Sequence, residues 1–332
     1  MRRRQVLFAG LSVCSGALAQ AQRTRVARIG FLVNNLAVLR APFFQPFFSA
    51  LAKLGWRETV EYTAEGRGSG GDPDRALAMA RELVASRVDL LVTTTTAAAV
   101  AAKRATDQIP IVSWLGYPVE AGLAQSLARP GGNVTGVTSY ASVNVWGKFI
   151  ELLRELRPGL RELGILWEYA PPAYPDGPIA IAIIERVAVQ LGINARIWLT
   201  RNEQEVITAL TSIRTAPAEA LIVTTGGGIH NQGDVPEKIG SLLIDRRLPA
   251  IGDLATPAFE RAACVLAYAP NVQDSMGRLA GLVDRVLRGA NPAEVPFEQP
   301  SRFDLVISKK AARAINLVIP QSILLRADRV IE

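Results

Sequence analysis

The feature that most constrains this chain is a regular alternation of short apolar segments with longer amphipathic ones. A mostly apolar strand pattern at Val26–Val33 precedes a helical pattern that ends near Gly55, and Val88–Thr94 is apolar like a buried parallel strand. The pattern restarts with a helix at Val145–Arg157 and a strand at Leu163–Tyr169. Two such series predict an α/β fold of two Rossmann-like lobes, each a parallel sheet with helices on both faces.

Further elements follow from the same periodicity. We expect a strand at Glu58–Glu65, a helix at Pro73–Ser86 and a helix at Val119–Ala128. In open α/β sheets, ligands bind beyond the carboxyl ends of the strands. The strand ends are therefore where candidate functional residues belong.

The N-terminus resembles a secretory signal peptide. Arg2, Arg3 and Arg4 precede an apolar run from Val6 to Ala19 and small residues suited to cleavage, so residues 1–21 are expected to be removed. Both general secretion and twin-arginine export fit this pattern. We therefore expect a periplasmic protein.

Cleavage changes what the composition implies. The net charge falls from +7 to about +4, which is too small and scattered to predict nucleic-acid binding. Cys264 is left as the one cysteine, so neither an intramolecular disulfide nor a thiolate metal cluster is expected.

A literal G-x-G-x-x-G occurs at Gly66, Gly68 and Gly71, and we interpret it as a surface turn. The preceding segment is polar, whereas a dinucleotide fingerprint follows a buried apolar strand. Asp72 is the expected N-cap of the next helix, and its carboxylate lies where a pyrophosphate needs positive potential.

The chain offers no constellation of catalytic residues. His230 is the only histidine, and we expect an exposed loop residue rather than a general base. We therefore predict a protein that is not an enzyme and that uses no cofactor or metal.

The strand ends of the first half carry polar and aromatic candidates for ligand binding. Threonine hydroxyls and free N–H groups at a helix start suit a carboxylate, although the same threonines could merely cap the helix. An aromatic pair could stack on a flat ligand or simply pack between the lobes. The candidates are Asn34, Asn35, Thr94, Thr95, Thr96, Trp114, Gly116 and Tyr117.

The second half adds candidates at its own strand ends. Asp253 could pair with a ligand ammonium or cap the helix at Thr256. Tyr169, Thr225 and Tyr268 complete the set. Donors on one lobe facing a carboxylate on the other would suit a zwitterion such as an amino acid.

The segment "RPGGNVTGVTSY" (Arg129–Tyr140) is similar to the signature of a bacterial ABC-transporter substrate-binding family that contains tryptophan- and tyrosine-type transport proteins. "RIGFLV", "CVLAYAPNVQD" and "SRFDLVISKKAARAINLVIPQSILLRADRVIE" also resemble it. The resemblance extends over essentially the whole mature chain. It departs at Ala267-Tyr268-Ala269, where relatives usually have Ser-Tyr-Gly.

The resemblance implies a type I periplasmic-binding-protein fold with a three-crossing hinge that clamps a ligand between the lobes. The crossings are expected near Gly136–Tyr140, Val265–Pro270 and Phe303–Ile307. One lobe would then hold residues 22–138 and 270–296, and the other 139–269 and 297–332.

The function implied is an extracytoplasmic solute-binding protein of an ABC importer. Its expected partners are a small amino-acid-like or carboxylate ligand and an inner-membrane ABC permease, and the protein is expected to be a monomer. The alternative is a ligand-sensing module for a membrane receptor or sensor kinase.

Overall fold

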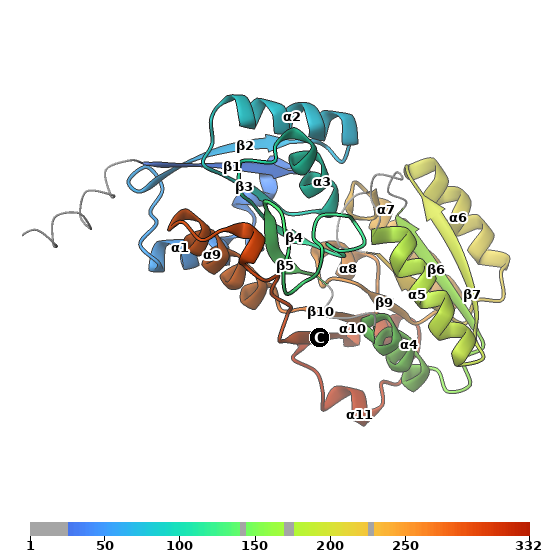
Figure 1. The fold of residues 1–332 in the computed structure, drawn as a ribbon. Coiled ribbons are helices and arrows are strands. Elements are labelled where there is room, and N and C mark those ends of the chain that lie inside the picture. Colours follow the sequence, from blue (N-terminus) through green and yellow to red (C-terminus); the bar gives the residue numbers. More distant parts are fainter. Residues whose placement is uncertain (1–25, 140–143, 169–175, 225–228) are drawn as a thin grey trace, which may run out of the picture.

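The computed structural model describes residues 26–139, 144–168, 176–224 and 229–332. The expected signal peptide, Tyr169 and Thr225 lie outside the described residues. Figure 1 shows two α/β lobes side by side, which confirms the predicted fold class.

Lobe 1 is built on a five-stranded parallel sheet of order β2-β1-β3-β4-β5. Helices α1 and α9 cover one face, and α2 and α3 cover the other. Strands β3, β4 and β5 are buried at every position, and for β3 this is what the continuous apolar run at Val88–Thr94 predicted. The elements are β1 (Ala27–Val33), α1 (Gln45–Lys53), β2 (Tyr62–Gly68), α2 (Pro73–Ala85), β3 (Leu90–Thr93), α3 (Thr96–Ala105), β4 (Ile111–Leu115), β5 (Val134–Thr138) and α9 (Val272–Leu287), with short 3₁₀ turns η2 (Leu36–Arg40) and η4 (Pro292–Glu294).

Lobe 2 is built on a seven-stranded sheet of order β12-β11-β10-β9-β8-β6-β7. Helices α4, α5, α10 and α11 contribute to one hydrophobic cluster, and α6, α7 and α8 to the other. The elements are α4 (Asn144–Leu156), β6 (Glu162–Glu168), α5 (Asp176–Gln190), β7 (Asn194–Thr200), α6 (Glu203–Thr215), β8 (Ala220–Val223), η3 (Ile229–Asn231), α7 (Val235–Arg246), β9 (Ala250–Gly252), α8 (Pro257–Arg261), β10 (Leu266–Pro270), β11 (Phe303–Ser308), α10 (Lys309–Ala314), α11 (Gln321–Leu324) and β12 (Arg329–Ile331).

The chain passes between the lobes three times. It leaves lobe 1 after Thr138, returns from lobe 2 after Pro270, and leaves again after Glu298, which bonds to the β5 backbone. Both β5 and β10 exit at their carboxyl ends, so the carboxyl ends of the two sheets face each other. The third crossing precedes β11 and is therefore a few residues earlier than predicted.

One pair of strands departs from the parallel arrangement. β10 and β11 are antiparallel, with Pro270 opposite Phe303. Because the chain leaves lobe 2 at the end of β10 and re-enters at the same end, β11 has to run in the opposite direction.

Two local predictions were wrong. Residues 119–128 form turns rather than a helix, because Gly122 has a φ of 69° and the Pro118 carbonyl accepts bonds from two turn amides. The strand expected at Glu58–Glu65 begins only at Tyr62, after a turn in which Thr59 has a φ of 68°.

The glycine-rich segment is divided between two elements. Gly66 and Gly68 lie in β2, whereas Gly70 and Gly71 have positive φ in the turn that follows. Asp72 then caps α2 by accepting a bond from the Arg75 N–H at 2.8 Å. The expected surface turn is thus confirmed at Gly70 and Gly71, whereas Gly66 and Gly68 belong to the strand before it. The capping carboxylate of Asp72 lies at the helix start, as expected.

Candidate ligand-binding site

The threonines after β3 have different roles in the structure. Thr95 is the N-cap of α3, and its hydroxyl accepts a bond from the Ala98 N–H at 3.2 Å. Thr94 is half-buried. Thr96 is 2% exposed, and its hydroxyl accepts a bond from the Gly116 N–H at 3.1 Å. The end of β3 is thereby joined to the end of β4.

The hydroxyl of Thr96 also donates to a carboxylate of the opposite lobe. Its partner is Oδ2 of Asp176, the first residue of α5. The Tyr117 N–H donates to Oδ1 of the same carboxylate at 3.2 Å. Lobe 1 therefore offers a set of neutral donors that bind a carboxylate with both of its oxygens. We call Thr96, Gly116 and Tyr117 the anion cradle.

Gly116 is what allows this close approach. A Cβ atom at Gly116 would lie 2.7 Å from Cγ and from Oδ1 of Asp176. Real Cβ atoms do not come this close to other heavy atoms, so a side chain at this position would exclude the carboxylate.

The charge of Asp176 is costly at this location. Burial raises the pKa of Asp176 above its ordinary value, and the bonds from Thr96 and Tyr117 oppose that rise. Glu120 raises the pKa further by charge repulsion. The donors of the anion cradle therefore stabilise an anion that is largely removed from water.

Tyr117 joins the lobes through its side chain as well. Its ring is 6% exposed and belongs to the hydrophobic cluster of lobe 2. Its hydroxyl accepts a bond from the Trp146 Nε1–H at 2.9 Å, and burial raises the pKa of Tyr117 above its ordinary value. In this conformation the ring fills the interior of lobe 2.

Two polar atoms near the carboxyl ends of β4 and β5 are buried without hydrogen-bond partners among the described residues. They are the Trp114 Nε1 and the Thr138 Oγ1, in residues that are 7% and 1% exposed. The Trp114 ring packs 5.4 Å from that of Phe43. Buried donors normally have acceptors, so an acceptor supplied by a ligand would satisfy them.

The asparagines after β1 are engaged locally. Asn35 caps η2, and its Oδ1 accepts a bond from the Ala37 N–H at 2.9 Å. Asn34 accepts through its side chain from the Ser69 hydroxyl at 3.4 Å and through its carbonyl from the Gly70 N–H at 2.7 Å. The asparagines thus hold the glycine turn against the end of β1.

Lobe 2 contributes two acids near its strand ends. Glu168 ends β6, and its Oε1 accepts a bond from the Ile229 N–H at 2.9 Å. Burial raises the pKa of Glu168 to about 7, and the nearby charge of Asp253 adds to that effect. Asp253 follows β9, while Thr256 is the N-cap of α8.

Tyr268 packs within lobe 2. Its ring stacks on that of Phe303, with centroids 5.2 Å apart, and meets Phe149 edge-on. The structure therefore brings Thr96, Gly116 and Tyr117 together. Asn34 and Asn35 instead bond to neighbouring turns, and Tyr268 packs against aromatic rings of lobe 2.

The single histidine is buried, so the expectation of an exposed residue was wrong. His230 is 0% exposed. Its Nδ1 lies 3.0 Å from the Thr224 carbonyl, which can only accept, so Nε2 is the acceptor for the Thr200 hydroxyl at 2.7 Å. Burial lowers the pKa of His230 to about 4, and this residue is part of the fold of lobe 2.

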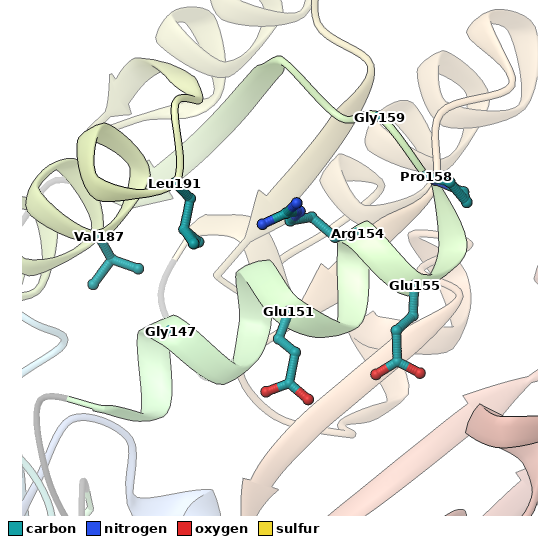
Figure 2. A pocket seen from close by; sticks show the side chains of 8 residues that line it. All are labelled: Gly147, Glu151, Arg154, Glu155, Pro158, Gly159, Val187 and Leu191. Atoms are coloured by element: carbon teal, nitrogen blue, oxygen red, sulfur yellow. The ribbon is translucent and has the colours of Figure 1, made fainter.

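A surface cavity of about 610 Å³ lies away from the facing strand ends, between α4 and α5. Figure 2 shows Arg154 extending from α4 toward Leu191, with Glu151 and Glu155 on the other side of α4. Glu155 pairs with Arg326 at 2.5 Å. The cavity belongs to lobe 2 alone and shares no residue with the anion cradle.

Asp176 is the contact that sequence reasoning missed. An acid in the first turn of a helix is common, and nothing local distinguishes this one. Over the described ranges, no cluster of three or more histidine, cysteine or acidic residues is arranged to hold a metal ion. The helices of those same ranges include none that is long and apolar enough to span a membrane.

A family model and a curated relative match most of this chain. The family model described as ABC transporter substrate binding protein matches residues 41–331. A tyrosine-binding protein of Clostridioides difficile (strain R20291) is 24% identical over 277 residues, which cover 82% of this chain and 75% of that protein.

Two solved structures are similar over 92% of this chain and 100% of their own. One is a conserved domain protein from Vibrio cholerae, with 23% identity and a TM-score of 0.81. The other is an ABC domain from Streptococcus pneumoniae in complex with L-Trp, with 23% identity and a TM-score of 0.79.

Proposed function

The chain belongs to the ABC transporter substrate-binding protein family, and from this we propose that it is the extracytoplasmic solute-binding protein of an ABC importer. Its fold is that of the type I periplasmic binding proteins, in which two lobes close on a ligand. We infer that the ligand is a small amino-acid-like molecule or carboxylate, bound where the carboxyl ends of the two sheets face each other.

One observation supports a carboxylate ligand above all. The Thr96 hydroxyl and the Tyr117 N–H donate to both oxygens of a carboxylate, that of Asp176. Groups that bind one carboxylate with this geometry are suited to bind another. Thr94 and the N-terminus of α3 add polar groups beside them.

The opposite lobe is suited to a positive group. Asp253 and Glu168 are acids close enough for the charge of one to raise the pKa of the other, so a ligand ammonium between them would relieve their repulsion. On the lobe 1 side, Trp114 offers an indole N–H without a partner among the described residues.

The comparisons suggest which ligands to test first. One relative is named a tyrosine-binding protein, and one similar structure is a complex with L-Trp, so aromatic amino acids are the first candidates.

Further parts of the proposal concern the biological setting. We propose lobe boundaries close to residues 138/139, 269/270 and 296/297, export through residues 1–21 and delivery of the ligand to an inner-membrane permease. The proposed role is binding by a monomer, without catalysis.

A thermal-shift screen of the refolded protein tests this function. Refolding removes carried-over ligand, and the screen compares amino acids, aromatic acids, the matching amines and sugars. A micromolar binder at millimolar concentration should add roughly 4 kcal/mol of stability. Shifts by aromatic amino acids would support the proposal. Shifts by sugars alone, with none by any amino acid or carboxylate, would refute it.

A further inference from the structure

The anion cradle of lobe 1 is already filled by the protein itself. Asp176 reaches it from the start of α5 in lobe 2 and accepts hydrogen bonds directly from the Thr96 hydroxyl and the Tyr117 N–H. We propose that Asp176 is an internal competitor for the ligand's carboxylate: it closes the empty protein on itself and must leave the cradle when the ligand binds. This inference rests on the proposed function, since it assumes a ligand that carries a carboxylate.

The contact is built from both sides. Lobe 1 supplies a hydroxyl donor at Thr96, a backbone donor at Tyr117 and the space left by Gly116. Lobe 2 supplies a carboxylate at the first position of a 15-residue helix. The hydroxyl of Thr96 is oriented by the Gly116 N–H, which occupies one of its lone pairs and leaves its proton for the carboxylate.

Two carboxylates cannot share this cradle. The hydroxyl of Thr96 has one proton to donate, and so has the Tyr117 amide. Glu120 already opposes the charge of Asp176, and a second anion at the same donors would add a stronger repulsion. A ligand carboxylate therefore binds there only after Asp176 has withdrawn.

Competition of this kind lowers apparent affinity. A cradle that Asp176 occupies for about nine-tenths of the time binds the ligand's carboxylate about tenfold more weakly than a vacant cradle would, whereas a ligand without a carboxylate leaves the Asp176 contact in place. Asp176 would thus determine how much carboxylate ligand is needed, and would affect little the binding of an analogue that lacks the carboxylate.

The first experiment needs no ligand. Small-angle X-ray scattering would be measured on the refolded wild-type chain and on three variants, Asp176→Ala, Gly116→Ala and Thr96→Val. The first removes the carboxylate, the second excludes it by bulk, and the third removes the hydroxyl donor. Asp74→Ala is the matched control, because Asp74 is an exposed first-turn acid of α2.

We expect the three variants to have a larger radius of gyration than the wild type, and the control to match the wild type. Far-UV circular dichroism identifies any variant that fails to fold, and the other two then decide. An unchanged radius in every folded variant would overturn the proposal.

The second experiment separates competition from ligand contact. Calorimetric titration with L-tryptophan and with tryptamine, the same molecule without its carboxylate, would be compared in wild type and Asp176→Ala. Competition predicts about tenfold tighter L-tryptophan binding in the variant, and no change for tryptamine. Weaker binding of both compounds would show that Asp176 holds the ligand's ammonium, and would refute competition.

The two experiments also distinguish the two proposals. If neither protein binds L-tryptophan, this amino acid is excluded as the ligand, and the thermal-shift screen decides on the proposed ligand class. The scattering result then decides on its own whether Asp176 closes the lobes.

Discussion

His230 leads to a quantitative prediction about stability and pH. Its pKa falls from an ordinary 6.5 to about 4 because the ring is buried. Above pH 6.5 the ring is neutral in both the folded and the unfolded chain and contributes no pH dependence. As the pH falls below 6.5, His230 of the unfolded chain binds a proton, whereas His230 of the folded chain stays neutral until about pH 4. Folding stability is therefore lost on acidification across this window.

The size of the effect follows from the two pKa values. A difference of one in pKa corresponds to about 1.36 kcal/mol, so this histidine should remove about 2.5 kcal/mol of stability between pH 7.5 and pH 4.5. The wild-type curve alone cannot reveal it, because Glu168 acts with the opposite sign. The pKa of that residue is raised to about 7, which favours folding as the pH falls.

The assay is a comparison of wild type with His230→Gln by urea unfolding at a series of pH values. The stability advantage of the wild type should shrink by about 2.5 kcal/mol from pH 7.5 to pH 4.5. Since the chain has one histidine, the imidazole Cε1–H signal of an untagged protein also gives the pKa directly by NMR. Parallel stability curves, or an imidazole pKa near 6.5, would show that burial of this ring has been misjudged.

Three further predictions concern single residues. The wild type should lose about 2.5 kcal/mol of stability through Glu168 as the pH rises from 4.5 to 7, and Glu168→Gln should abolish that loss because no buried carboxylate then has to ionise; pH-dependent urea unfolding measures this, and an unchanged slope would contradict it. Gly136→Ala should destabilise lobe 1 by about 4 kcal/mol or more, since a Cβ there would lie 1.8 Å from the Ser113 carbonyl oxygen, whereas Gly277→Ala meets open space and should be tolerated; equal melting temperatures for the two variants would refute the argument. Asp253→Ala should weaken binding of an ammonium-bearing ligand about tenfold or more without unfolding the protein, as judged by calorimetry and circular dichroism, and unchanged affinity would remove this residue from the site.

Much of the fold could be predicted from sequence because buried parallel strands are continuous apolar runs. Such runs identify β3, β4 and β8 directly. The same pattern reading gave a wrong prediction for residues 119–128. Their apolar spacing matches a helix, whereas Gly122 and the prolines around it favour turns. Local pattern predicts an element best when no backbone constraint interrupts it.

The contacts of the candidate site could be predicted only in part from the sequence. Thr96 was identified because a polar residue at the end of an apolar strand is conspicuous. Its partner Asp176 is 80 residues away in the sequence and on the other lobe, so no local pattern connects them. His230 was misjudged because its sequence neighbours are polar and glycine-rich, whereas its environment is created by Thr200 of a distant strand.

Tyr117 has its backbone in one lobe and its ring in the other. Any rotation that separates the sheets must therefore either withdraw that ring from the cluster around Trp146 or carry the residues after Leu115 along with lobe 2. In the second case the rigid unit that moves would be lobe 2 together with the residues after Leu115, although those residues follow a strand of the lobe 1 sheet. The pivot would then include the loop after β4 as well as the three chain crossings, and lobe 2 would carry a small piece of lobe 1 with it.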